Sequence, residues 1–105
     1  MVTVSLQIPT EHPAFAGHFP GMPIVPGALL LDETVRVLGA AAGQDGLHCE
    51  IATAKFLSVV HPGETLTLEH ERGADGWVRF VMRALDRPVL SGRLTWLASL
   101  EGRGT

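Results

Sequence analysis

The sequence predicts an α+β domain in which an antiparallel sheet packs around one helix. A single stretch, at about residues 27–41, has the length and apolar content of a buried helix. Strand-like patterns precede it at residues 2–8 and dominate the chain after residue 46. Of the 105 residues, 46% are hydrophobic and 18% are charged, so we expect residues 1–105 to form one domain with its own core.

The first strand is indicated by alternation. Apolar residues occupy every second position from Val2 to Ile8, and the residues between them are polar. This period of two is typical of a strand with one buried face. Pro9 ends the pattern, and residues 12–16 are expected to form a short turn of helix before a long loop.

The helix is expected to begin at Pro26-Gly27 and to stop at Gly43. Proline suits the first helical turn, because its missing N–H costs nothing there. The residues between are apolar on most sides, and the polar sector is small: Asp32, Glu33 and Arg36. A helix of this kind is expected to be buried on all but one side.

Four more strands are expected in the second half of the chain, at residues 48–60, 64–72, 77–85 and 89–98. Turns are indicated by Pro62-Gly63 and by the glycines at 73 and 76. Leu66, Leu68 and His70 should share one face of their strand. The residues of the last hairpin that are expected to face the core are Val78, Phe80, Met82, Ala84, Leu90, Leu94 and Trp96.

The expected register of the last two hairpins predicts where the arginines in the second half of the chain lie on the sheet. A turn at residues 86–88 would set Arg79 and Arg83 diagonal to Arg93 on one face of the sheet. The preceding hairpin would set Glu69 against Arg79. Arg83 and Arg93 then lack obvious acidic partners and are candidates for docking an acidic protein, although a solvated face with one ordinary ion pair is the simpler interpretation.

Charge and composition disfavour several classes of function. Residues 1–71 carry two basic and eight acidic residues, whereas residues 72–105 carry six arginines and three acids, for a net charge of −3. An acidic chain without a basic stripe among aromatics is a poor nucleic-acid binder. The five histidines show no metal-ligand spacing, and no Walker loop or GxGxxG occurs, so we expect no metal and no cofactor.

The chain is expected to be cytoplasmic. Its first residues lack the basic start and the long apolar segment of a signal peptide. No apolar run approaches the roughly 18 residues of a membrane span. Cys49 is the only cysteine and cannot form an internal disulfide, which fits a reducing compartment.

The stretch from His12 to Asp32 carries the chemistry. Its prolines fix φ and its glycines free it, so the loop should be stiff with an unusual path. It supplies a histidine, the free N–H groups of a helix start and an acid, which could act as a base, an oxyanion-binding group and a proton donor. The alternative is a structural histidine with an ordinary ion pair between Asp32 and Arg36 at i,i+4.

The segment GHFPGMPIVPGALLLDE, residues 17–33, resembles the signature of bacterial 3-hydroxyacyl-[acyl carrier protein] dehydratases of the FabZ/FabA type, which belong to the hot-dog fold superfamily. The run from His18 to Asp32 matches without insertion or deletion. Residues 54–66, AKFLSVVHPGETL, also resemble the family's Lys-Phe strand and the Pro-Gly-acid turn after it. The resemblance covers roughly residues 10–98.

This resemblance implies an antiparallel sheet wrapped around one central helix. It also implies dehydration of a 3-hydroxyacyl thioester, carried by acyl carrier protein, to the trans-2-enoyl thioester. The pathway would be fatty-acid synthesis or a related polyene or polyketide-like synthesis. Family members pair through the sheet edge, so we expect a homodimer, a heterodimer or a higher oligomer of dimers, with the acyl tunnel at the interface.

The family roles map onto single residues of this chain. His18 would take the C2 proton, the backbone N–H of Gly27 would hold the thioester oxygen, and Asp32 would help the C3 hydroxyl leave as water. Phe19 and Leu29 are candidates for lining the acyl tunnel. In the family, the histidine and the acid that meet come from opposite subunits.

Arg36 departs from the family, which usually carries glutamine at this position. If Arg36 pairs with Asp32, the acid becomes a poorer proton donor. This keeps open a second interpretation, a non-catalytic acyl-carrier-binding partner subunit of a dehydratase heterodimer. A third is a hot-dog acyl thioesterase, although such enzymes usually lack the His-Phe-Pro-Gly run.

Overall fold

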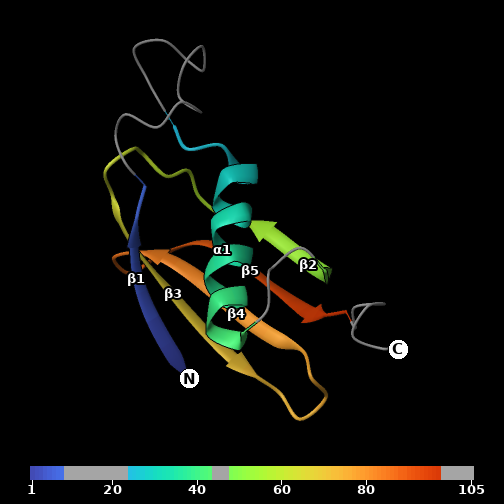
Figure 1. Ribbon diagram of the computed structural model, residues 1–105. Coiled ribbons are helices and arrows are strands. Elements are labelled where there is room, and N and C mark those ends of the chain that lie inside the picture. The colour runs from blue at the N-terminus through green and yellow to red at the C-terminus, as the bar shows by residue number, and fades with distance from the viewer. Residues whose placement is uncertain (9–23, 44–47, 98–105) are drawn as a thin grey trace.

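A computed structural model shows one helix lying across one face of a five-stranded antiparallel sheet (Figure 1). The structure describes residues 1–8, 24–43 and 48–97. The helical turn expected at residues 12–16 lies outside these ranges, as do His18 and Phe19.

The elements follow the expected order along the chain. They are β1 (Val2–Gln7), α1 (Gly27–Ala42), β2 (Cys49–Phe56), β3 (Thr65–Arg72), β4 (Val78–Ala84) and β5 (Arg87–Trp96). The strands lie in the order β1-β3-β4-β5-β2, and every neighbouring pair is antiparallel. β1 and β2 are therefore the two edges, and α1 crosses the sheet between them in Figure 1.

β2 ends at Phe56 rather than at residue 60, where the sequence pattern placed its end. The Leu57 N–H still donates to Val89 O at 2.9 Å, but the chain then leaves the sheet. Val60 O accepts a hydrogen bond of 2.7 Å from the N–H of Val25, which lies just ahead of α1. This segment therefore ties the end of β2 to the start of the helix.

α1 has the ends that its sequence predicts. Pro26 is the N-cap residue, and Gly43 closes the helix at φ 72°, a left-handed conformation that glycine adopts without strain. The buried Thr34 satisfies its hydroxyl within the helix by donating to Leu30 O at 2.9 Å. No helix within the described residues has the length and hydropathy needed to cross a membrane.

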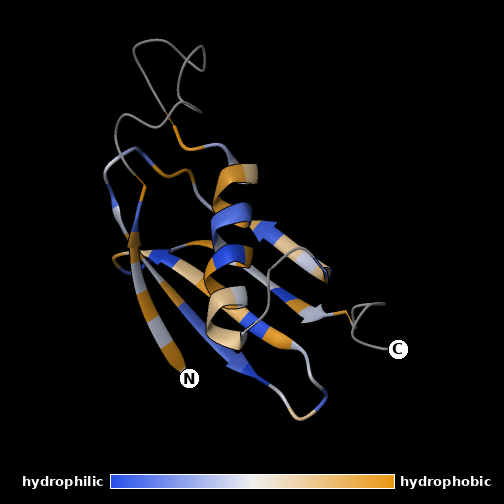
Figure 2. Cartoon of the chain, viewed as in Figure 1, coloured by the Kyte–Doolittle hydropathy of each residue, from blue (hydrophilic) through white to orange (hydrophobic). Residues whose placement is uncertain are grey.

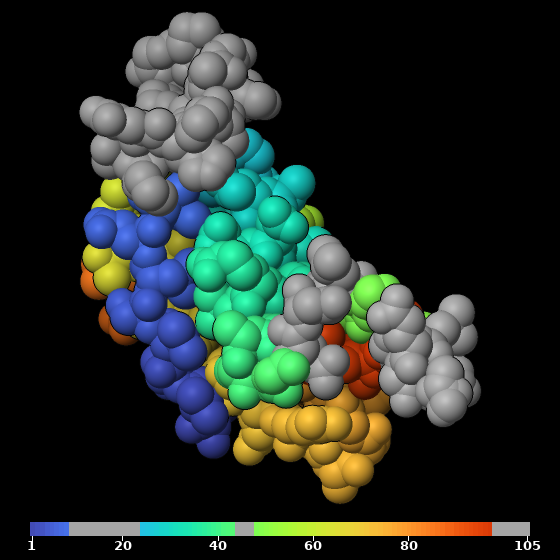
Figure 3. All heavy atoms as spheres, in the orientation of Figure 1, coloured from blue at the N-terminus to red at the C-terminus, as the bar shows by residue number. Residues whose placement is uncertain are grey.

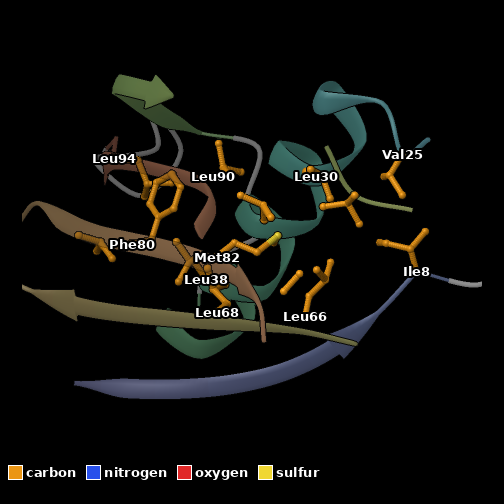
Figure 4. Close-up of a cluster of buried hydrophobic side chains, with 14 residues drawn as sticks. Ile8, Val25, Leu30, Leu38, Leu66, Leu68, Phe80, Met82, Leu90 and Leu94 are labelled. Atoms are coloured by element: carbon orange, nitrogen blue, oxygen red, sulfur yellow. The ribbon is translucent and has the colours of Figure 1, made fainter. Parts of the chain in front are cut away.

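The core lies between α1 and the sheet. Strand residues alternate between hydrophobic and hydrophilic in Figure 2, and the expected core residues Val78, Phe80, Met82 and Ala84 are all buried. Leu30 and Leu38 of α1 point into the same cluster (Figure 4). Its buried members are Ile8, Val25, Leu30, Leu38, Val60, Leu66, Leu68, Val78, Phe80, Met82, Ala84, Val89, Leu90 and Leu94.

The helix is less deeply buried than its composition suggested. Only Leu30, Thr34, Leu38 and Gly39 of α1 are buried. The outward side is open, and atoms of α1 form much of the front surface in Figure 3. In this one chain the sheet covers a single side of α1, because no second layer lies over the other side within the described residues.

The expected hairpin register is wrong by two residues. The β4–β5 turn is at Leu85-Asp86, where the error is three residues, because Ala84 pairs with Arg87. A bulge between Met82 and Arg83 reduces the error to two, so Arg79 lies directly opposite Arg93 rather than diagonal to it. In the preceding hairpin, Arg79 lies opposite Glu71 rather than Glu69.

Candidate active site at the start of the helix

The start of α1 presents unpaired backbone donors. Leu29 and Leu30 donate their N–H groups to Pro26 O at 3.0 and 3.3 Å. The N–H groups of Gly27 and Ala28 have no acceptor among the described residues, as expected for a first helical turn. Together with the helix dipole, such donors favour a negatively charged oxygen.

Asp32 lies about a turn and a half beyond Gly27 on the same helix, roughly 7.5 Å along its axis. Its side chain is exposed and makes no hydrogen bond or ion pair with any described residue. Leu29, in the first turn, is half-buried against the core. A carboxyl group near two free N–H groups can, in its protonated form, supply a proton donor beside an anion-binding position.

The alternative pairing of Arg36 with Asp32 is wrong. Arg36 Nε donates to Glu33 Oε2 at 3.1 Å, and its Nη2 contacts the same oxygen. This hydrogen bond, helped by the charge of Glu33, raises the pKa of Arg36. Asp32 therefore keeps its carboxylate free of Arg36 although the guanidinium lies one turn away.

Phe56 lies against the first residue of α1, a contact that the sequence pattern did not predict. Figure 1 shows the end of β2 beside α1, and a Cβ atom built onto Gly27 would lie 2.9 Å from Cε1 of Phe56. The Lys-Phe pair of the second motif was the available signal. Its contact with Gly27 joins two elements far apart in sequence, and a local pattern carries no information about such a contact.

The structure does not bring Arg83 and Arg93 to the helix start. β4 turns Phe80 and Met82 toward α1, so Arg79 and Arg83 lie on the opposite, outer face of the sheet. Contrary to expectation, Arg83 has an acidic partner, because its Nε bonds Glu69 Oε1 at 3.2 Å. Arg93 lies over the Trp77 ring, 4.7 Å from its centroid.

Two hollows lie elsewhere. One of 180 Å³ is at the last turn of α1, lined also by His70, Arg72 and Trp96. Another of 340 Å³ is a shallow depression on the outer face. Among the described residues, no group of three or more His, Cys, Asp and Glu side chains could hold a metal ion.

Comparison with known proteins gives the chain a family. The family described as ApeI-like, ApeI dehydratase, matches residues 1–93. The chain belongs to the ApeI-like dehydratase family. This membership agrees with the resemblance that residues 17–33 indicated, to the 3-hydroxyacyl-[acyl carrier protein] dehydratases.

Curated relatives of this ApeI-like chain carry the name FabZ. The 3-hydroxyacyl-[acyl-carrier-protein] dehydratase FabZ of Chlamydia trachomatis is 37% identical over 79 residues, which are 67% of this chain and 52% of that protein. The FabZ of Chlamydia pneumoniae is 30% identical over 93 residues, 74% of this chain and 61% of that protein. The chain thus spans about half the length of the first of these relatives and three fifths of the second.

Solved structures show the hot-dog fold. The dehydratase heterocomplex ApeI:P from Xenorhabdus doucetiae matches with a TM-score of 0.71 and 23% identity, over 91% of this chain and 86% of that one. A mutant of the fluoroacetyl-CoA-specific thioesterase FlK matches with a TM-score of 0.60 and 13% identity, over 92% and 88%. The expected sheet wrapped around one helix is thereby confirmed as a hot-dog fold.

Proposed function

We propose that this ApeI-like chain dehydrates a 3-hydroxyacyl thioester, carried by acyl carrier protein, to the trans-2-enoyl thioester. The observation that carries the proposal is the start of α1. Among the described residues, free N–H groups at Gly27 and Ala28 lie about a turn and a half from the unpaired carboxylate of Asp32. Membership in a dehydratase family supports the interpretation of these groups as reaction machinery.

Each group answers one difficulty of the reaction. The C2 proton of a thioester is weakly acidic, so a base must touch it, and His18 as neutral imidazole is the proposed base. As the C2–H bond breaks, negative charge gathers on the carbonyl oxygen, where the N–H of Gly27 would stabilise it. The electron pair then forms the C2–C3 double bond and the C3–O bond breaks. Asp32, entering the step as the protonated carboxyl group, gives its proton to the leaving hydroxyl, which departs as water and leaves Asp32 as the carboxylate.

We infer further that the active unit is a dimer formed along β2. This edge strand and the residues after it leave large apolar side chains exposed: Ile51 at 38%, Phe56 and Leu57 at 52% and Val59 at 54%. Exposed apolar strand edges favour pairing with another strand. A second copy is the proposed partner, and a different hot-dog subunit is the alternative that the ApeI:P heterocomplex suggests. Pairing would let His18 of one chain meet Asp32 of the other.

Acyl carrier protein remains the proposed donor of substrate. Of the two arginines expected to dock it, Arg83 is engaged by Glu69 while Arg93 rests on Trp77. Both lie on the outer face of the sheet, away from the helix start. If the carrier protein docks elsewhere, Arg83→Ala and Arg93→Ala will leave the KM for the carrier substrate nearly unchanged. A clear rise in the carrier KM for either variant would support the docking role.

The test of function is turnover by the purified chain alone. Incubation with a 3-hydroxyacyl carrier substrate should give the enoyl product, detected by mass spectrometry as loss of one water. His18→Ala and Asp32→Asn should each abolish product while the circular dichroism spectrum is kept. Full turnover by His18→Ala would remove the proposed base.

The same incubation separates the alternatives. Binding of the substrate without turnover, with turnover restored by a second hot-dog subunit, would indicate a non-catalytic partner of a heterodimer. Release of a free thiol instead of an enoyl thioester would indicate a thioesterase.

A further inference from the structure

The Phe56 ring fills the space next to the first residue of α1. A Cβ atom added to Gly27 would lie 2.9 Å from Cε1, 3.0 Å from Cδ1 and 3.3 Å from Cζ of the ring. Real Cβ atoms do not make contacts under 3.0 Å, so any other side chain at position 27 would have to displace the ring. Because Cα–Cβ bonds in a helix tilt toward its N-terminus, the ring lies on the side of Gly27 toward which its N–H points, and this N–H has no acceptor among the described residues.

The residue Phe56 is only half covered. Phe56 pairs in register with Leu90, which is fully buried, so its side chain is on the helix side of the sheet. Phe56 is nevertheless 52% exposed. One part of the ring therefore contacts Gly27, while the rest is an uncovered apolar surface at the helix start.

The backbone around both residues is tethered. Beyond Phe56, the Leu57 N–H bonds Val89 O at 2.9 Å. Before Gly27, the Val25 N–H bonds Val60 O at 2.7 Å, and both of these valines are buried. The ring and the helix start are therefore fixed relative to each other before any ligand arrives, which is what a preorganised site requires.

We propose that Phe56 is a positioning residue of the dehydratase site. Its ring forms one wall of the space where the thioester carbonyl meets the Gly27 N–H, and it keeps water from that oxygen. A hydrogen bond to a developing oxyanion is stronger where water is excluded, so the wall strengthens the donor beside it. A flat apolar ring also suits a planar thioester. This inference rests on the proposed function.

The kinetic test compares Phe56→Ala and Phe56→Leu with a control, Val2→Ala. Val2 is an apolar residue of similar exposure, at 54%, but it lies on β1, at the opposite edge of the sheet from Phe56. Phe56→Ala should lower kcat by about tenfold, less than the loss of an oxyanion donor itself, with a smaller change in KM. Phe56→Leu should retain more of kcat, and Val2→Ala should stay within about twofold of wild type.

Two outcomes would overturn the role. A rise in KM with unchanged kcat would make the ring a simple binding surface. Equal losses in Phe56→Ala and Leu57→Ala, with a fall in oligomer mass, would assign the effect to subunit pairing along β2.

A binding measurement separates this inference from the proposed function. The probe is the butyryl thioester of N-acetylcysteamine, which lacks a 3-hydroxyl and cannot be dehydrated. It should shift the amide resonance of Gly27 in wild type and in Val2→Ala, but much less in Phe56→Ala. If this pattern of shifts is seen but no protein turns over a 3-hydroxyacyl substrate, dehydration is rejected and the thioester-binding site is kept. If Phe56→Ala turns over normally and its Gly27 shift equals that of wild type, only the role of Phe56 is rejected.

Discussion

Arg36 bonds the carboxylate of Glu33, three residues before it, and leaves Asp32, four residues before it, without this cation as a partner. Both acids are within helical reach of the guanidinium. Glu33 is half-buried, whereas Asp32 points to solvent. Glu33 thus binds the Arg36 guanidinium, which would otherwise pair with Asp32, the proposed proton donor. This explains how the chain can carry arginine where glutamine is usual in the family.

Glu33→Gln should lower dehydratase activity although Glu33 itself touches no reacting atom. Arg36 would lose its charged partner and turn to Asp32, which stabilises that carboxylate and makes it a poorer proton donor. An exposed pair at this spacing is worth about 0.5 kcal/mol, so we expect a two- to threefold loss of kcat. Steady-state rates at low and high salt check this, because screening should restore activity.

Two companion variants make the Glu33 prediction specific. Arg36→Gln should keep wild-type activity, and Glu33→Gln combined with Arg36→Gln should recover it. If the double variant stays as slow as Glu33→Gln alone, the loss comes from Glu33 itself rather than from a released guanidinium.

The ionised carboxylate of Glu64 should make part of the folding stability depend on pH in the acid range. The His61 N–H donates to its carboxylate at 2.7 Å and lowers the pKa of Glu64 below its ordinary value of 4.5; Arg87 adds to the lowering. A lowered folded pKa means that the contribution is present above about pH 4.5 and is lost as pH falls through the folded pKa. Urea unfolding should show Glu64→Gln about 1 kcal/mol less stable at pH 7, and the gap should narrow near pH 3.

The Glu64 prediction has a structural readout as well. Arg87 Nη2 also donates to Val59 O at 3.1 Å, so the same cluster steadies the segment that leads from β2 to the helix start. Amide exchange around Val60 should be faster in Glu64→Gln. A pH-independent gap between the two proteins would mean that packing, not the ionised carboxylate, carries the effect.

His70 should cause a loss of folding stability that begins at a higher pH than the loss caused by Glu64. Burial, with a contribution from the N-terminal ammonium, lowers the pKa of His70 below its ordinary 6.5, and Nε2 is buried without a hydrogen-bond partner among the described residues. The fold therefore favours the neutral imidazole, and stability is lost as pH falls below about 6.5, where the unfolded chain takes up a proton first. His70→Leu should be at least as stable at pH 7.5 and lose less at pH 5.5.

His70→Leu also isolates the proposed catalytic histidine. If a neutral imidazole is the base, the activity of wild type should fall in acid as that imidazole is protonated. If that fall persists in His70→Leu while the loss of stability between pH 7.5 and 5.5 becomes smaller, the two titrations belong to different histidines. A flat activity profile in His70→Leu would instead trace the loss of activity to unfolding.

Much of the fold followed from local pattern. The period-2 residues of β4, Val78 to Ala84, are buried where alternation predicted, and the helix ends at Gly43 as its sequence indicated. Periodicity depends on which residues one element turns toward the core, so it can be read from that element alone. The site residues Gly27 and Asp32 are fixed on one helix for the same reason.

Register and pairing could not be read in this way. Leu85 adopts φ 55° in the β4–β5 turn, a conformation that leucine rarely takes, so no turn signal marked it. Val89 and Leu90 are both fully buried beside the bulge, which alternation does not allow. Because the predicted register was shifted by two residues, it assigned the wrong cross-strand neighbours to Arg79 and Arg83. Which of two acids Arg36 pairs with could likewise be learned only from the structure.

Gly92→Ala should damage the sheet beneath the site. A Cβ atom at this position in β5 would collide with Thr53 O of β2 and lie 2.7 Å from Cζ of Phe80. Backbone cannot move aside cheaply, so we expect a cost at the upper end of the roughly 1–3 kcal/mol typical of overpacking. Urea unfolding measures this cost. Because β2 carries Phe56, kcat should fall as well.

Gly43→Ala is the matched control for Gly92→Ala. Gly43 has φ 72°, and a Cβ there would meet no atom within 4 Å, so its cost is the left-handed backbone alone, about 1–2 kcal/mol. Amide exchange then separates the two variants: Gly92→Ala should open the β2–β5 pairs from Ile51 to Phe56, whereas Gly43→Ala should fray only the last turn of α1. Protected β2 amides in Gly92→Ala would show that Phe80 and the backbone at Thr53 accommodate the methyl group without opening the strand pairing, and kcat should then stay at the wild-type value.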